Sequence, residues 1–250
     1  AAKALDAKLR SDTGTATLTV GGAHAQANLS VDYTTWTAGM TLPPTGVALV
    51  GASAENRIIT AAGPGGQDEP VWACVDTDVG TGADGGFNIT ASHTIDRTQA
   101  YIFGVFIKTA NPNGTTYLGL DAWGTGTSLN TLAGTPSADA YAFSGDMPAQ
   151  NTWHLVIGYV HPYGYGSTDT GISGVYAVTD GSASSSVTRL LGGSEFKFTA
   201  SAAVMSARVL CYNHTTATAN EVQWMTRPVA VQAPLGTLAE AQGVIRYLNK

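Results

Sequence analysis

The stretch AYIFGVFIK, residues 100–108, decides the fold class. A strand turns successive side chains to opposite faces, so the odd-numbered positions from Tyr101 to Ile107 lie on one face and the even-numbered positions on the other. Both sets are mainly apolar, which is typical of a strand inside a sheet that is covered on both sides. TWHLVIGYVH, residues 152–161, has the same pattern and predicts a second central strand, with Trp153 as a core residue.

Further apolar, β-branched and aromatic segments flank these two, and turns rich in Gly and Pro separate them. Of the 250 residues, 30 are Gly and only 12% are charged, which suits many short strands and turns. About ten short strands in such a series indicate a two-sheet sandwich. We therefore expect an all-β fold, a two-sheet antiparallel sandwich of jelly-roll type, as one domain over residues 13–230.

The first twelve residues, AAKALDAKLRSD, have a different pattern. Ala2, Leu5 and Leu9 recur at three- and four-residue spacing, which predicts the apolar seam of a short helix. Such a helix is too short to be stable alone. Residues 1–12 are therefore either a stalk segment that continues upstream and joins several chains, or a terminal helix that frays.

The last segment, residues 234–250, also predicts a helix. Thr237 and Glu240 form a capping box ahead of apolar residues that share one helical face. That face either closes one end of the sandwich or meets a second copy of the chain.

Charge and hydropathy argue against two classes of partner. The formal net charge is −6, and only 12 Lys and Arg are scattered along the chain, so no basic patch is available for nucleic acid. No apolar run approaches the roughly 20 residues that cross a bilayer, so we expect no membrane insertion. Cys74 and Cys211 both lie in apolar alternating segments, which favours buried thiols over a disulfide.

Residues 141–166 contain Ser144, Asp146, His154 and His161 and raise the question of a hydrolase. A serine hydrolase needs a nucleophile on a strained turn beside a base and a carboxylate, and the sequence has no Gly-x-Ser-x-Gly elbow. His154 and His161 are seven residues apart on one predicted strand, so they point to opposite faces. We therefore predict no catalytic residues and no enzymatic activity.

One glycine-rich loop contains carboxylates that suit a metal ion. Asp76, Asp78 and Asp84 lie in DTDVGTGADGG, where carboxylates alternating with Gly can wrap calcium. The loop lacks the bidentate Glu of an EF-hand. Either a structural calcium ion or a plain turn fits the pattern, and we expect no other cofactor.

Several longer stretches together resemble a β-sandwich module of tail-fibre and spike proteins from tailed phages, phage-like gene transfer agents and related marine bacterial proteins. The resemblance runs from about residue 54 to residue 228. It is carried, in order, by the motifs ADGG at 83–86, GTTY at 114–117, SGDMP at 144–148, and Trp, Leu, Gly-Tyr and His within 153–161. This chain departs from the family pattern at Phe87, where a Trp is usual, and at TANPNG, residues 109–114, where a Lys-rich turn is frequent.

The resemblance implies a receptor-binding or adhesive protein on the surface of a phage-like particle, extracellular when acting. It also implies a homotrimer joined through N-terminal helical segments, which would attach residues 1–12 to another particle protein. The receptor that we expect is a host cell-surface polysaccharide, capsule or lipopolysaccharide, bound without cleavage. A polysaccharide-degrading hydrolase or lyase domain and a purely structural fibre component are the alternatives.

The aromatic residues of two glycine-rich loops are the candidates for binding. Aromatic rings on sandwich loops stack on sugar rings, and small polar neighbours hydrogen-bond the hydroxyls. HPYGYGSTD supplies His161, Tyr163 and Tyr165, and DAWGTG supplies Trp123. The other interpretation is that Tyr163 and Tyr165 only pack the loop.

Overall fold

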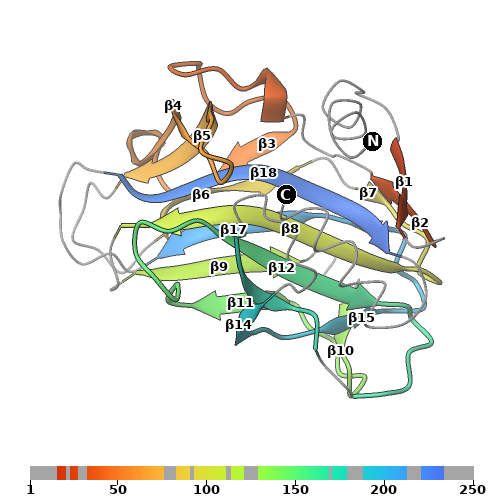
Figure 1. The fold of residues 1–250 in the computed structure, drawn as a ribbon. Helices are drawn as coiled ribbons and strands as arrows, with labels where there is room; N and C mark the ends of the chain where they lie inside the picture. The colour runs from red at the N-terminus through yellow and green to blue at the C-terminus, as the bar shows by residue number, and fades with distance from the viewer. Residues whose placement is uncertain are drawn as a thin grey trace.

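The computed structural model describes residues 16–20, 23–27, 33–75, 83–90, 93–110, 114–120, 129–168, 171–178, 188–212 and 221–233. Two large sheets pack face to face, and they are drawn as ribbons in Figure 1. All but one of the described strand pairings are antiparallel, the exception being the short pairing of β12 with β15. The predicted all-β, two-sheet sandwich is confirmed, while the jelly-roll connectivity stays a prediction.

The larger sheet is centred on the strand that contains residues 100–108. Its main order is β1 (Ala16–Val20), β2 (Ala23–Ala27), β18 (Glu221–Ala233), β8 (Ala100–Thr109), β12 (His154–His161), β13 (Gly174–Ala177) and β14 (Arg189–Gly192). Four more strands join it at the sides, namely β4 (Asn56–Ala62), β5 (Asp68–Val75), β10 (Leu129–Thr131) and β15 (Phe196–Phe198). In Figure 1, β4 and β5 lie above the long strand β18.

The smaller sheet has five strands. In order they are β11 (Tyr141–Gly145), β9 (Thr115–Leu120), β17 (Ala207–Tyr212), β6 (Ala83–Ile89) and β3 (Val47–Leu49). A separate short pair joins β7 (His93–Thr94) to β16 (Val204–Met205), and two single turns of 3-10 helix cover Tyr33–Thr35 (η1) and Ser53–Glu55 (η2). The described residues contain no helix that is long and apolar enough to span a membrane.

The core between the sheets is aromatic at its centre. Trp36, Trp72 and Phe87 are almost fully buried and contact one another, with ring centroids 5.0 to 5.8 Å apart. Cys74 and Cys211 lie in the same core as free thiols, which confirms the preference for buried thiols.

The other face of the larger sheet is also apolar and buried. Ile102 and Phe106 of β8 belong to this second cluster together with Leu155 and Ile157 of β12. Both faces of the two central strands are therefore buried, as the alternation predicts. Trp153 corrects one detail, because it packs only partly buried against the second cluster and is not a core residue.

A bulge interrupts the long strand β18. The register shifts between Thr226 and Val229, and Arg227 adopts a left-handed φ of 52°. The bulge turns the Arg227 guanidinium toward Glu69 of β5, which accepts hydrogen bonds from Nε at 3.0 and 3.1 Å. Thr226 Oγ1 donates to the same carboxylate at 2.9 Å. These contacts fix β5 against β18.

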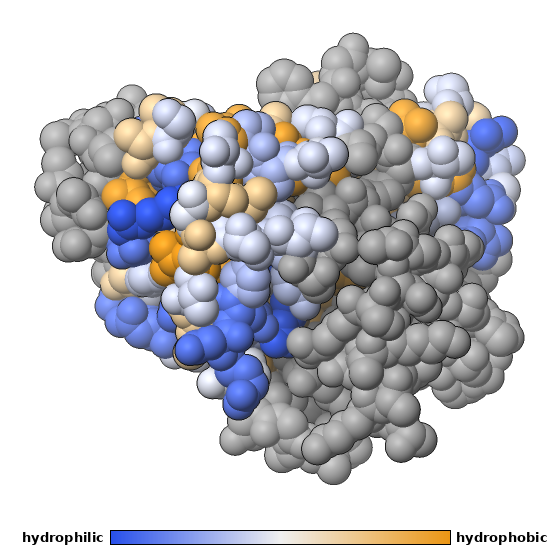
Figure 2. Space-filling model, turned by 90° about the horizontal axis from the view of Figure 1, so that it is seen from above, coloured by the Kyte–Doolittle hydropathy of each residue, from blue (hydrophilic) through white to orange (hydrophobic). Residues whose placement is uncertain are grey.

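On the face shown in Figure 2, hydrophobic residues lie in small groups among hydrophilic and neutral ones. The predicted stalk at 1–12 and the predicted helix at 234–250 lie outside the described residues, so both stay predictions.

Candidate functional site

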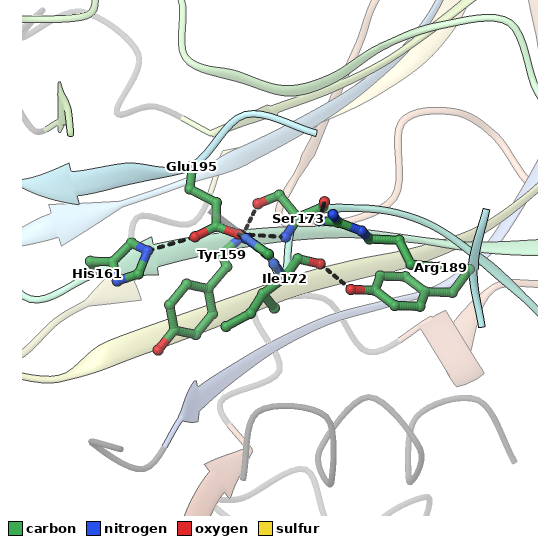
Figure 3. A network of polar contacts seen from close by, with 8 residues as sticks. Tyr159, His161, Ile172, Ser173, Arg189 and Glu195 are labelled. Carbon is green, nitrogen blue, oxygen red and sulfur yellow. Dashed lines mark hydrogen bonds and ion pairs between the residues drawn. The ribbon is translucent and has the colours of Figure 1, made fainter. Parts of the chain in front are cut away.

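The site begins where strand β12 ends. His161 is the last residue of β12, and its Nε2 lies 2.6 Å from Oε2 of Glu195, which precedes β15. Figure 3 shows the two side chains meeting beside the sheet. The exposed fractions are 6% for His161 and 5% for Glu195. A carboxylate only accepts, so Nε2–H of the imidazole is the donor.

The second oxygen of Glu195 binds backbone. Its Oε1 accepts the N–H groups of three successive residues, Gly171 at 2.8 Å, Ile172 at 2.5 Å and Ser173 at 3.0 Å. Burial alone would raise the pKa of Glu195, but the hydrogen bonds from His161 and from the three N–H groups outweigh it and lower the pKa. Glu195 is therefore a buried carboxylate that stays ionised because four donors hydrogen-bond its two oxygens.

The network continues along residues 172–189 (Figure 3). Ser173 Oγ accepts the backbone N–H of Tyr159 at 2.9 Å, and the Ser173 carbonyl accepts from Arg189 Nη1 at 3.3 Å. Tyr176 donates its hydroxyl to the carbonyl of Ile172, and burial raises the pKa of Tyr176 to about 12. These bonds hold the 171–173 segment on the sheet.

The loop that follows β12 is fastened at three points. The Tyr165 ring stacks on the His161 ring, with centroids 3.7 Å apart and planes 22° apart. The Tyr165 carbonyl accepts from Lys197 Nζ at 3.2 Å, and the Tyr163 N–H donates to the Arg97 carbonyl at 2.9 Å. The Tyr163 side chain remains 49% exposed, the largest value among the big apolar side chains of the described residues.

The predicted binding residues differ in their exposure. Tyr163 is exposed as a platform should be, and Tyr165 is half-buried. For His161 the predicted exposed position is wrong, because its imidazole lies between Tyr159, Tyr165 and Glu195. Trp123 lies outside the described residues.

The predicted calcium loop is described only at its end. Asp76 and Asp78 lie outside the described residues, and Asp84 is described only as a backbone position of β6. In the part of the chain that the structure describes, no three His, Cys, Asp or Glu side chains gather as metal ligands. Calcium at the 76–84 loop stays a prediction.

The residues that raised the question of a hydrolase differ in their exposure. Ser144 and Asp146 are exposed, whereas His154 is 2% exposed. Within the described ranges, His154 Nδ1 has no hydrogen-bond partner, and burial lowers the pKa of this imidazole. The absence of enzymatic activity stays a prediction.

Sequence patterns gave no indication of Glu195. The residue lies in GGSEFKF and is brought to His161 only by the parallel pairing of β15 with the end of β12. A lone carboxylate before an apolar strand could have drawn attention, but the three N–H groups that it accepts lie more than 20 residues away.

Comparisons with known proteins show little similarity. No family model matches the chain, and no curated protein matches it. Among solved structures, the CBM22-1–GH10 modules of endo-1,4-β-D-xylanase 10B from Clostridium thermocellum, complexed with xylohexaose, share 10% identity at a TM-score of 0.39, covering 77% of this chain and 27% of that one. An exo-β-agarase shares 10% at 0.38, covering 78% and 24%.

Infectious bursal disease virus, Gt strain, shares 13% identity at a TM-score of 0.31, covering 88% of this chain and 44% of that chain. This chain therefore spans less than half of each of these three chains. Similarities this distant indicate nothing about ligand or activity. The strand pairing itself defines the class, a β-sandwich protein with an exposed aromatic loop that is anchored through a buried carboxylate.

Proposed function

We propose that this chain is the receptor-binding part of a fibre or spike on a phage-like particle, and that it binds host cell-surface polysaccharide without cleaving it. The resemblance over residues 54–228 supports the particle and the adhesive role. One structural observation supports the binding site: the half-exposed Tyr163 ring is held on a loop whose neighbours are locked to the sheet.

Rigid presentation matters for a weak ligand. A sugar ring stacks on an aromatic face with little energy per contact, so any loop ordering at binding would subtract from the affinity. In this protein the loop is already ordered before binding. Glu195 holds His161, the Tyr165 ring stacks on His161, and Lys197 donates a hydrogen bond to the Tyr165 carbonyl. The loop therefore presents Tyr163 at a low entropic cost.

A homotrimer fits this role, since three weak contacts on one particle raise the avidity. We propose trimerisation through residues 1–12, with attachment to the particle at the same end. Light scattering on the complete protein should give three times the chain mass. A monomer at micromolar concentration would rule out this arrangement.

The test of the proposed function is a pull-down of purified host capsule and lipopolysaccharide by the whole protein, with a reducing-sugar assay on the same samples. We expect retention of at least one polysaccharide and no new reducing ends. Tyr163→Ala should weaken this retention. Thr168→Ala, an exposed change on the same loop, is its matched control and should not. Release of reducing ends would instead make the chain a degrading enzyme.

A further inference from the structure

A second aromatic cluster lies at the other end of β8 from the Tyr163 loop. Lys108 stands near the end of β8, and its Nζ lies 4.6 Å from the ring centroid of Trp224 and 5.1 Å from that of Trp153. Trp224 is the direct cross-strand partner of Lys108. The pairing of His154 with Ile107, continued by one residue, places Trp153 on its other side. Trp153, Lys108 and Trp224 thus form one row across three adjacent strands, here called the Trp–Lys–Trp row.

The charge of Lys108 is not matched by any acid of the described residues. Three described arginines, Arg57, Arg208 and Arg227, each pair with a carboxylate, at Glu221, Asp139 and Glu69 respectively. Within the described ranges, Lys108 makes neither an ion pair nor a hydrogen bond, and its ammonium contacts only the two indole faces. Partial burial lowers the pKa of Lys108, which reflects the loss of water around its ammonium.

The two indoles differ in the hydrogen bonding of their N–H groups. Trp153 Nε1 donates to the Ala62 carbonyl at 3.0 Å, which fixes that ring against β4. The N–H of Trp224 meets no acceptor among the residues that the structure describes. All three residues of the row are half-buried, so each keeps part of its surface in contact with solvent. The row therefore offers a cation, an N–H donor that no described residue occupies, and aromatic surface within two strand spacings, roughly 10 Å.

We propose that the Trp–Lys–Trp row binds a carboxylated sugar, such as the uronic acid unit of an acidic polysaccharide. In a uronate the carboxylate is attached to a carbon of the sugar ring, and one face of the ring presents apolar C–H groups. One unit can therefore present its acid to an ammonium while its C–H face lies on an indole. The row supplies both partners from adjacent strands of a rigid sheet. This inference rests on the proposed polysaccharide-binding function and specifies the class of polysaccharide.

The experiment compares binding to immobilised polygalacturonate with binding to the same polymer after methyl esterification, which removes the charge and keeps the backbone. The unmodified whole protein should bind the acid form about tenfold more tightly than the ester, because an ammonium–carboxylate contact contributes on that scale. Lys108→Met keeps the aliphatic stem between the indoles and removes the charge, so it should abolish this preference. Melting curves should show that the variant remains folded.

Arg208→Met is the matched control. Arg208 lies on β17 of the smaller sheet, whereas the row lies on the larger sheet, and the change removes the same charge. It should leave the preference for the acid form intact. An equal loss in Arg208→Met would mean that net charge alone is responsible, and would overturn the inference.

The two proposals fail separately. If the unmodified protein binds acid and ester equally, or binds neither, the Trp–Lys–Trp row is not a uronate site, while the capsule and lipopolysaccharide pull-down still decides the proposed function. If Lys108→Met keeps the acid preference, the row is likewise excluded. If Lys108→Met removes the preference and Tyr163→Ala does not, the row binds the acidic sugar independently of the loop.

Discussion

His161 and Glu195 are 34 residues apart in sequence, yet their side chains meet at 2.6 Å with more than nine-tenths of each residue buried. The contact joins the end of β12 to the residue before β15, and through Oε1 it also holds the 171–173 segment. Three parts of the chain thus depend on one carboxylate. That dependence leads to the first prediction.

Glu195→Ala should lower the free energy of unfolding by about 3–5 kcal/mol, because it leaves a buried imidazole and three backbone N–H groups without their acceptor. Urea unfolding measures the change. Glu221→Ala, which breaks the more exposed ion pair with Arg57, is the control and should cost less than about 1 kcal/mol. Equal effects of the two changes would show that the buried network does not anchor the loop.

Acid should destabilise the fold in two stages. The pKa of His154 is lowered by burial, so the unfolded chain binds more protons and stability falls as the pH drops below about 6.5. The lowered pKa of Glu195 contributes stability above about 4.5 that is lost as the pH falls further. Urea unfolding at pH 7, 5.5 and 4 should show both decreases, and Glu195→Gln should remove the second. Constant stability from pH 7 to pH 4 would contradict both assignments.

Tyr176 should respond to alkali. Its pKa is raised to about 12 from an ordinary value of 10, so the stability that it contributes is complete below pH 10 and is lost as the pH rises toward 12. Burial also raises the pKa values of Tyr101 and Tyr141, so absorbance at 295 nm should show late tyrosine steps, and Tyr176→Phe should remove the step near pH 12. A step near pH 12 that persists in the variant would assign it to another residue.

The core and the sheet surface should respond differently to loss of a Trp. Trp72→Ala should cost about 3–5 kcal/mol, because it opens the contact with Trp36 and Phe87 and removes the indole N–H that donates to Asn56 Oδ1 at 2.9 Å. Trp153→Ala should cost less, since that ring is only partly buried. Thermal or urea unfolding of the two variants orders them directly. The reverse order would mean that the outer face of the sheet, not the inter-sheet core, dominates stability.

Local sequence patterns predicted the central strands, but they did not predict the hydrogen-bond network around Glu195. The alternation in residues 100–108 predicted burial on both faces, and Ile102 and Phe103 are both buried as a result. His161 continues the alternation of β12 on the same face as Tyr159, so its burial was readable from the period, but its neighbours Pro162 and Gly164 suggested a loop instead. The partner of His161 could not be predicted, because the parallel pairing that brings Glu195 close arises from tertiary topology and not from any spacing in the sequence.

The Trp–Lys–Trp row has the same origin. Trp153, Lys108 and Trp224 come from three separate segments, and only the registers of β8 with β12 and β18 place them side by side. The exposure of Tyr163, by contrast, was predictable from the sequence, because an aromatic residue in a Pro- and Gly-rich turn is seldom buried.

The most direct test of the central claim is the equilibrium binding of the whole protein to host cell-surface polysaccharide, measured for the unmodified chain, Tyr163→Ala and Tyr163→Phe. Tyr163→Ala should weaken binding about tenfold or more, and Tyr163→Phe should restore most of it because the ring face is kept. The free energy of unfolding should change by less than about 0.5 kcal/mol, since the side chain is half-exposed. Unchanged affinity in Tyr163→Ala, with the protein still folded, would contradict the assignment of the binding site to this loop.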